Sequence, residues 1–268
     1  MSQLETTAHE NPFAVDEGSA GGPMGTPLFS SQVHEEALAR LLFVAESAQP
    51  CGLLAGPEGS GKSRLLKRFT SDLRRRGRQA YAIDLTGLNA ARLLVRIDAT
   101  LGLGCGVSTD PLKTWDSVLA AIDGLRQARL PAVLVLDHAD QAHYDAWTLV
   151  DQLLALGAGS LTAIVATRGL AAGPLTEFVR RHASLRIELD RLSVDQTAEY
   201  VRGAFRRIGM DETPFAEGAL RRVYELTRGE PRLVNRLCRI AMTAAAADGL
   251  AEIEESLIEA AAAEILMV

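Results

Sequence analysis

The chain has 268 residues, of which 47% are apolar and 23% are charged, and its net charge is −6. This balance excludes disorder over the full length. The net negative charge argues against non-specific binding to nucleic acid or to anionic membranes, although it does not exclude a local basic patch. Three separated cysteines, Cys51, Cys105 and Cys238, have the spacing of neither a zinc site nor a disulfide framework. With no secretory signal and no apolar run of the roughly 18 residues that a membrane helix needs, we expect a soluble, cytoplasmic protein.

Residues 1–26 are rich in Gly, Ser, Thr, Glu and Pro, and we expect them to form a flexible arm. In residues 27–192, apolar runs of strand length alternate with helical patterns, which predicts an α/β domain with a five-stranded parallel sheet between helices. The predicted strands are Cys51–Ala55, Gln79–Leu85, Ala132–Leu136, Leu161–Ala166 and Leu185–Leu189. The predicted helices are Val33–Ser47, Lys62–Arg76, Asn89–Leu101, Thr114–Arg126, Tyr144–Leu156 and Leu175–His182.

The strand signal stops at the end of this domain, and residues 193–268 show helical patterns alone. The sequence therefore predicts a second, small helical domain at the C-terminus. Its expected helices are Val194–Ile208, Ala216–Thr227, Pro231–Ala247 and Ile253–Leu266.

A glycine-rich loop follows the first predicted strand and precedes a predicted helix. It matches G-x-x-x-x-G-K-[ST] at every fixed position, through Gly56, Pro57, Glu58, Gly59, Ser60, Gly61, Lys62 and Ser63. Glycines let the backbone N–H groups turn toward phosphate oxygens, and the helix N-terminus adds a positive dipole. We expect Lys62 to reach the β- and γ-phosphates of a nucleotide and the Ser63 hydroxyl to bind Mg²⁺.

Such a site also needs a carboxylate at the end of a neighbouring buried strand, and Asp137 ends the apolar run Ala132–Leu136. We expect Asp137 to hold the Mg²⁺ water shell. The next residue, His138, stands where most hydrolysing enzymes of this type have a glutamate that polarises the attacking water, and Asp140 is a second candidate for that task. Thr167, at the end of the fourth predicted strand, is a candidate contact to the γ-phosphate or to the water.

These residues together resemble an AAA+ ATPase, and more narrowly the ExeA/GspA type, which is associated with type II secretion and related to transposition ATPases. The narrower resemblance is carried by the lead-in Asn11-Pro12-Phe13 and, most specifically, by the stretch Thr227–Cys238. The last ten residues of this stretch, Gly229-Glu230-Pro231-Arg232-Leu233-Val234-Asn235-Arg236-Leu237-Cys238, are similar to a G-x-P-R-x-x-N-x-L-C signature. The resemblance implies that the C-terminal domain is a lid over the nucleotide. It does not extend to the membrane span and cell-wall-binding region of secretion members.

The resemblance also implies roles for single residues. Arg232 would be the sensor-2 arginine that reaches the γ-phosphate from the lid, and Thr167 would be sensor 1. Arg186 is the first candidate for an arginine finger acting on a neighbouring subunit, with Arg180 and Arg181 as alternatives. His138 departs from the D-E-A-[QH] run of the family, which places efficient hydrolysis in question.

The sequence therefore predicts an ATP-binding, Mg²⁺-dependent ATPase that forms a homo-oligomer and assembles or remodels a protein or protein–DNA complex. The alternative is a nucleotide-gated adaptor or DNA-binding regulator that hydrolyses little ATP. A small-molecule kinase is less favoured, because the lid follows all five strands. Basic residues lie on the predicted helix that follows the glycine-rich loop and in the expected lid. They could bind DNA phosphates, or they could be solvent-exposed residues that pair with acidic side chains.

Overall fold

The computed structural model describes residues 11–13, 31–103 and 110–266. These residues form two compact units. One is an α/β unit made of residues 34–58 and 62–189, and the other is a helical unit that extends from residue 190 toward the C-terminus and groups with it residues 11–13, 31–33 and 59–61. The flexibility expected for residues 1–26 concerns positions that lie, apart from 11–13, outside the described residues.

The α/β unit is built on a five-stranded sheet in which every pair of neighbouring strands is parallel. The strand order is β2-β3-β4-β1-β5. The strands are β1 (Cys51–Ala55), β2 (Gln79–Asp84), β3 (Ala132–Asp137), β4 (Leu161–Thr167) and β5 (Ala183–Glu188). The predicted fold class, a five-stranded parallel sheet followed by a helical domain, is confirmed.

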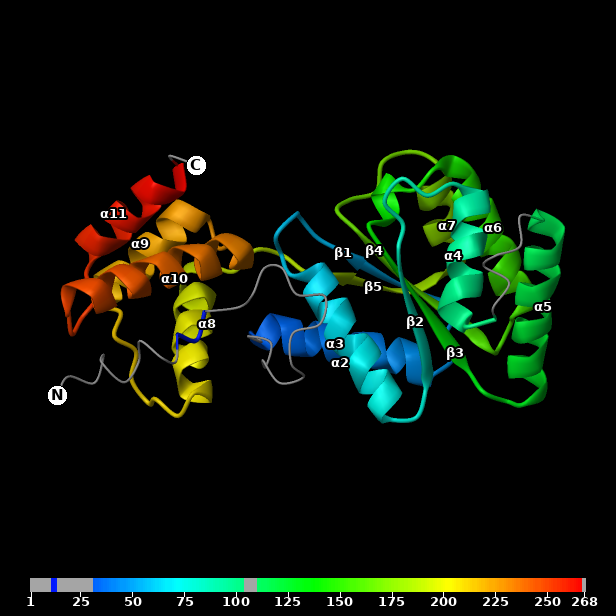
Figure 1. Ribbon diagram of the computed structural model, residues 1–268, viewed down its shortest axis with the longest axis horizontal. Helices are drawn as coiled ribbons and strands as arrows, with labels where there is room; N and C mark the ends of the chain where they lie inside the picture. Colours follow the sequence, from blue (N-terminus) through cyan, green and yellow to red (C-terminus); the bar gives the residue numbers. More distant parts are fainter. Residues whose placement is uncertain (1–10, 14–30, 104–109, 267–268) are drawn as a thin grey trace. The chain divides into compact units, whose positions relative to one another are not determined.

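Helices cover both faces of this sheet (Figure 1). On one face lie α2 (Gln32–Glu46) and α3 (Lys62–Arg75); on the other lie α4 (Ala90–Leu101), α6 (Tyr144–Leu156) and α7 (Pro174–His182), with α5 (Pro111–Gln127) packed against α4. Because β1 and β4 are buried on both faces, every residue of these two strands is buried. The edge strand β5 instead alternates between covered and exposed residues.

Capping residues set some helix bounds that hydrophobic periodicity misses. Helix α5 begins at Pro111 rather than at the predicted Thr114, because the Asp110 side chain accepts the Leu112 N–H and Pro111 occupies the first turn. A short 3₁₀ helix, η2 (Ala139–Gln141), directly follows β3.

The helical unit contains α8 (Val194–Arg207), α9 (Glu217–Thr227), α10 (Pro231–Asp248) and α11 (Glu255–Leu266) around a core of its own. The predicted last helix starts at Glu255 and not at Ile253, since Ile253 forms a β-bridge with Phe215. Phe13, in the segment expected to be an arm, is only 3% exposed and packs edge-on against Phe205 with ring centroids 5.9 Å apart.

Residues of the Gly229–Cys238 stretch have structural roles within this unit. Gly229 adopts a left-handed conformation with φ of 68°, and its carbonyl oxygen accepts the Leu192 N–H. The Asn235 amide donates a hydrogen bond to the Tyr200 hydroxyl over 3.0 Å, and Leu237 and Cys238 are buried in the core. The stretch therefore joins α8, α9 and α10.

The two described cysteines, Cys51 and Cys238, are buried free thiols. Burial raises the pKa of the Cys51 thiol to about 12 and raises that of Cys238 as well. Cys105 lies outside the described residues. Among the described residues, no helix combines the length and the apolar character needed to cross a membrane.

Candidate nucleotide site

The glycine-rich loop connects the end of β1 to the start of α3. Gly59 and Gly61 have φ values of 78° and 97°, a region that residues with a Cβ adopt only at a cost. The Gly56 N–H donates to the Thr167 carbonyl oxygen over 3.2 Å, which ties the start of the loop to the end of β4. Because α3 begins at Lys62, its unpaired N–H groups and positive dipole end lie directly after the loop.

Lys62 is only 9% exposed, and its ammonium group bonds to the loop backbone. Nζ donates to the carbonyl oxygens of Gly56 at 2.6 Å and of Pro57 at 2.7 Å. Burial lowers the pKa of Lys62, while the carboxylates of Asp137 and Asp140 oppose that shift. The loop thus presents a cation among oxygen acceptors at the carboxyl edge of the sheet, where a phosphate oxygen could be bound.

Asp137 ends β3 with a side chain that is 18% exposed. Its Oδ1 accepts the backbone N–H of His138 over 2.8 Å. The sequence analysis expected this carboxylate on a strand next to the loop strand, and that expectation is wrong: β4 lies between β1 and β3. The parallel register nevertheless brings the ends of β1, β3 and β4 to one edge of the sheet.

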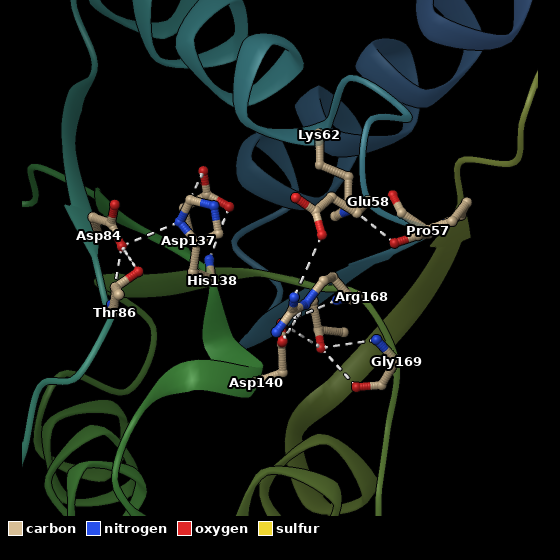
Figure 2. Close-up of polar contacts among 12 residues, drawn as sticks. Pro57, Glu58, Lys62, Asp84, Thr86, Asp137, His138, Asp140, Arg168 and Gly169 are labelled. Carbon is tan, nitrogen blue, oxygen red and sulfur yellow. Dashed lines mark hydrogen bonds and ion pairs between the residues drawn. The ribbon is translucent and has the colours of Figure 1, made fainter. Parts of the chain in front are cut away.

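His138 faces a carboxylate that the sequence analysis missed. Its Nδ1 lies 3.1 Å from Oδ1 of Asp84, at the end of β2, where Asp84 pairs with Asp137 across the parallel ladder (Figure 2). Asp84 also accepts hydrogen bonds from the Thr86 N–H at 2.9 Å and the Thr86 hydroxyl at 2.7 Å. Burial alone would raise the pKa of Asp84, but these bonds and the nearby imidazole outweigh burial and lower the pKa.

Asp140 belongs to a second cluster, which it forms with Arg168, the residue that directly follows β4 (Figure 2). Oδ2 of Asp140 accepts Nε of Arg168 at 2.7 Å, and Oδ1 accepts the Arg168 backbone N–H at 3.0 Å. Burial would raise the pKa of Asp140, but the hydrogen bonds from Arg168 lower it. Nη1 of Arg168 lies 3.6 Å from Oε2 of Glu58, so Arg168 connects the glycine-rich loop to η2.

Thr167 is buried at the end of β4 beside this second cluster. Its hydroxyl donates to the Gly169 carbonyl oxygen at 2.7 Å and lies 3.3 Å from Oδ1 of Asp140. The hydroxyl is therefore held at the same edge of the sheet as Lys62 and Asp137. The α/β unit thus assembles Lys62, Asp137, His138, Asp140 and Thr167, all of which the sequence analysis selected.

The remaining predicted residues are Ser63, beside Lys62, and four arginines in the two units. Ser63 is half-buried in the first turn of α3, next to Lys62. Arg186 is exposed within β5 and pairs with Glu188 at 2.8 Å. The alternative fingers Arg180 and Arg181, on α7, pair with Glu177 and Asp151, each at 2.6 Å. Arg232 lies in the first turn of α10 in the helical unit, with an exposed side chain.

The donor set of the glycine-rich loop and of the strand ends beside it fits a nucleoside triphosphate with a divalent cation. Two left-handed glycines, a helix N-terminus and a lysine are the groups that bind phosphate oxygens. A hydroxyl and a carboxylate with water are ligands that Mg²⁺ accepts, and Ser63 and Asp137 would supply them.

Residues 45–168 match the AAA domain family. No curated protein sequence matches the chain significantly. Three solved structures with similar folds are Cdc6p from Pyrobaculum aerophilum (17% identity, TM-score 0.67, 87% of this chain and 66% of that chain), Drosophila ORC bound to DNA (18%, 0.66, 87% and 60%) and the RuvB Holliday junction branch migration motor of Thermotoga maritima (17%, 0.54, 85% and 67%). This chain thus spans less than two thirds of the first two. Together the family match and these folds show an AAA+ P-loop NTPase fold.

Proposed function

We propose that this AAA+ P-loop protein binds ATP with Mg²⁺ at Gly56–Ser63 and hydrolyses it to drive assembly or remodelling of a protein or protein–DNA complex. The observation that carries the proposal is the convergence of Lys62, Asp137 and Thr167 at one edge of the sheet, beside a glycine loop that opens a helix. A solvated turn would not require a buried lysine in contact with two loop carbonyls.

In this proposal the loop N–H groups and Lys62 bind the phosphate oxygens, and Ser63 and Asp137 hold Mg²⁺. When bound, Mg²⁺ would neutralise charge on the phosphates. Thr167 would contact the γ-phosphate or the attacking water. Arg232 would act as sensor 2 from the lid.

In the proposed assembly, an arginine finger from the neighbouring subunit would contact the nucleotide bound to each subunit. Arg186 remains the first candidate, since its pairing with Glu188 is exposed to solvent and can exchange at low cost. Arg180 and Arg181 remain the alternatives. The assembly would be a homo-oligomer, because a finger acting in trans requires a second copy of the chain.

The narrower kinship to ExeA/GspA-type ATPases also belongs to the proposal. It is supported by the Gly229–Cys238 stretch, whose glycine, asparagine and cysteine have defined places in the helical unit. Two of the similar structures are ORC bound to DNA and a Holliday junction branch migration motor. A protein–DNA complex is therefore one class of target that we propose for this chain.

The experiment compares the wild type with Lys62→Ala and with Lys67→Ala, which removes an exposed lysine from the same helix. ATP binding is measured by calorimetry, turnover by phosphate release, and assembly by light scattering after gel filtration, with and without ATP and Mg²⁺. We expect Lys62→Ala to abolish binding and turnover and Lys67→Ala to retain both. Nucleotide binding that survives Lys62→Ala unchanged would refute the proposal.

A second candidate function is a nucleotide-gated adaptor or DNA-binding regulator with little hydrolysis. It is favoured by His138 in place of glutamate and by the hydrogen bonds that engage Asp140. Against its DNA-binding form, several candidate arginines pair with acids on the same unit, as in Arg68–Glu35 and Arg202–Glu217. A nearly silent wild type together with a strong gain in turnover for His138→Glu would favour this candidate, and brisk wild-type turnover would reject it.

A further inference from the structure

The carboxyl group of Glu230 packs against Gly59 of the glycine-rich loop. Both residues belong to the helical unit, which groups residues 59–61 with the residues from 190 onward. A Cβ added to Gly59 would lie within 2.5 Å of three atoms at the end of the Glu230 side chain, namely Cγ, Cδ and Oε1. Since no side chain fits at position 59, the end of Glu230 lies directly against the backbone of the loop.

Glu230 is the N-cap residue of α10, a position where a side chain commonly accepts a hydrogen bond from the first N–H groups of the helix. Within the described part of the chain its side chain makes no such bond, and Arg191 is its one ion-pair partner. Oε2 of Glu230 lies 3.4 Å from Nη2 of Arg191, and the Glu230 side chain is only 15% exposed. The carboxylate is therefore turned away from the helix that it begins and toward the loop.

The position of this carboxylate opposes the role proposed for the loop. In that role the N–H groups beside the left-handed Gly59 and Gly61 turn toward phosphate oxygens, which bring negative charge to the same short segment. A carboxylate at this segment repels them, and the repulsion is stronger beside protein than in bulk water. Arg191 offsets little of it, because its ion pair with Glu230 is long and its own side chain is 45% exposed. Phosphate and Glu230 therefore compete for one part of the loop.

We propose that Glu230 is an autoinhibitory residue, whose carboxylate lies on the loop in the nucleotide-free protein and must leave Gly59 before phosphates bind. This inference rests on the proposed binding of ATP at Gly56–Ser63. Arg232 lies two residues further along, in the first turn of α10. One short segment thus carries both the carboxylate that opposes phosphate binding and the cation that the proposed function assigns to the γ-phosphate.

The first test measures ATP affinity by calorimetry in the presence of Mg²⁺. Glu230→Gln keeps the shape of the side chain and removes its charge, and Glu217→Gln, at the start of α9, is the matched control with the same change in net charge. We expect Glu230→Gln to bind ATP at least about fivefold more tightly than the wild type and Glu217→Gln to stay within about twofold of it. The gain should shrink at high salt, because salt screens the repulsion that the substitution removes.

The second test needs no nucleotide. Hydrogen exchange read by mass spectrometry reports the opening of the loop peptide in the free protein, and peptides from α8–α11 show in the same experiment that each variant is folded. Glu230→Ala removes the side chain that covers Gly59, so the loop peptide should exchange at least about threefold faster than in the wild type. Glu217→Ala should leave the loop peptide unchanged.

The outcomes separate the inference from the proposed function. If the wild type bound ATP and Glu230→Gln bound it no more tightly, the inference alone would be overturned. A loop peptide that exchanged equally in Glu230→Ala and in the wild type would also overturn it, whether or not ATP bound. ATP binding by Glu230→Gln but not by the wild type would support both, and an absence of ATP binding in every variant would overturn the proposed function.

Discussion

Gly229 lies in the turn that leads into α10, three residues before Arg232. Its φ is +68°, and a Cβ added to it would lie 1.9 Å from the Leu192 carbonyl oxygen and 2.8 Å from the Leu192 carbonyl carbon. These are backbone atoms, and Leu192 is itself fixed by its hydrogen bond to the Gly229 carbonyl oxygen. A Gly229→Ala protein can therefore fold only if the turn or the Leu192 segment shifts.

The expected cost has two parts. A left-handed conformation costs a residue with a Cβ about 1–2 kcal/mol, and overpacking typically costs about 1–3 kcal/mol more. We expect Gly229→Ala to lower the free energy of unfolding of the helical unit by about 2–5 kcal/mol. Gly249 is the matched control, because it ends α10 with φ of +64° and has no atom within 4 Å of the added Cβ. Gly249→Ala should cost only about 1–2 kcal/mol.

The assay must report on each unit separately. Hydrogen exchange read by mass spectrometry gives the opening free energy of peptides from α8–α11 and, in the same experiment, of peptides from the sheet. We expect Gly229→Ala to increase exchange in α8–α11 far more than Gly249→Ala does. Equal destabilisation by the two variants would show that Leu192 does not confine this turn, and the reasoning would fail.

Three further predictions concern contacts within single units. Arg168→Ala leaves the carboxylates of Glu58 and Asp140 without their cation beside the loop, so ATP affinity measured by calorimetry should fall several-fold, whereas Arg126→Ala on α5 should not change it. The folded-state pKa of Asp140 lies below its ordinary 3.8, so its ionised form stabilises the fold above that pH and this contribution is lost on further acidification; Asp140→Asn should therefore flatten the acid limb of a stability–pH curve. Phe13→Ala should destabilise the helical unit by about 3 kcal/mol in the same exchange experiment, and no effect would mean that its buried ring contributes nothing.

Burial explains how much of the fold could be predicted from the sequence. β1 has the predicted bounds, Cys51–Ala55, because a strand covered on both faces is a continuous apolar run between turn residues. The edge strand was predicted as Leu185–Leu189 but spans Ala183–Glu188, since an alternating strand marks its ends less clearly. The helix expected to start at Thr114 starts at Pro111 instead, because Asp110 caps it. The pair Asp110-Pro111 is a start signal of its own, which hydrophobic periodicity does not include.

The site was predicted in part for a different physical reason. The glycine loop and Asp137 are local patterns, so they can be read along the chain. Asp84 was missed because its role depends on which strand β2 pairs with and in which register, and neither is written in the local sequence. One signal was available: two predicted strands carry an aspartate at or near their end, which in a parallel sheet brings both carboxylates to the same edge.

The partners of the three aspartates at this edge lead to a last prediction. Asp140 is held by the guanidinium of Arg168, Asp84 by the Thr86 donors and the imidazole, and Asp137 accepts the His138 backbone N–H. Glutamate at position 138 would bring a further negative charge toward Asp84 and Asp137, and like charges disfavour ionisation of the new carboxylate.

His138→Glu alone should therefore carry a carboxyl group whose pKa lies above its ordinary range. Adding Asp84→Asn removes one of the two negative neighbours and should lower that pKa, so the acid limb of the kcat–pH profile should move to lower pH. The comparison needs phosphate-release kinetics over a range of pH on His138→Glu and on the double variant. An acid limb at the same pH in both proteins would show that the charge of Asp84 does not act on the residue at position 138.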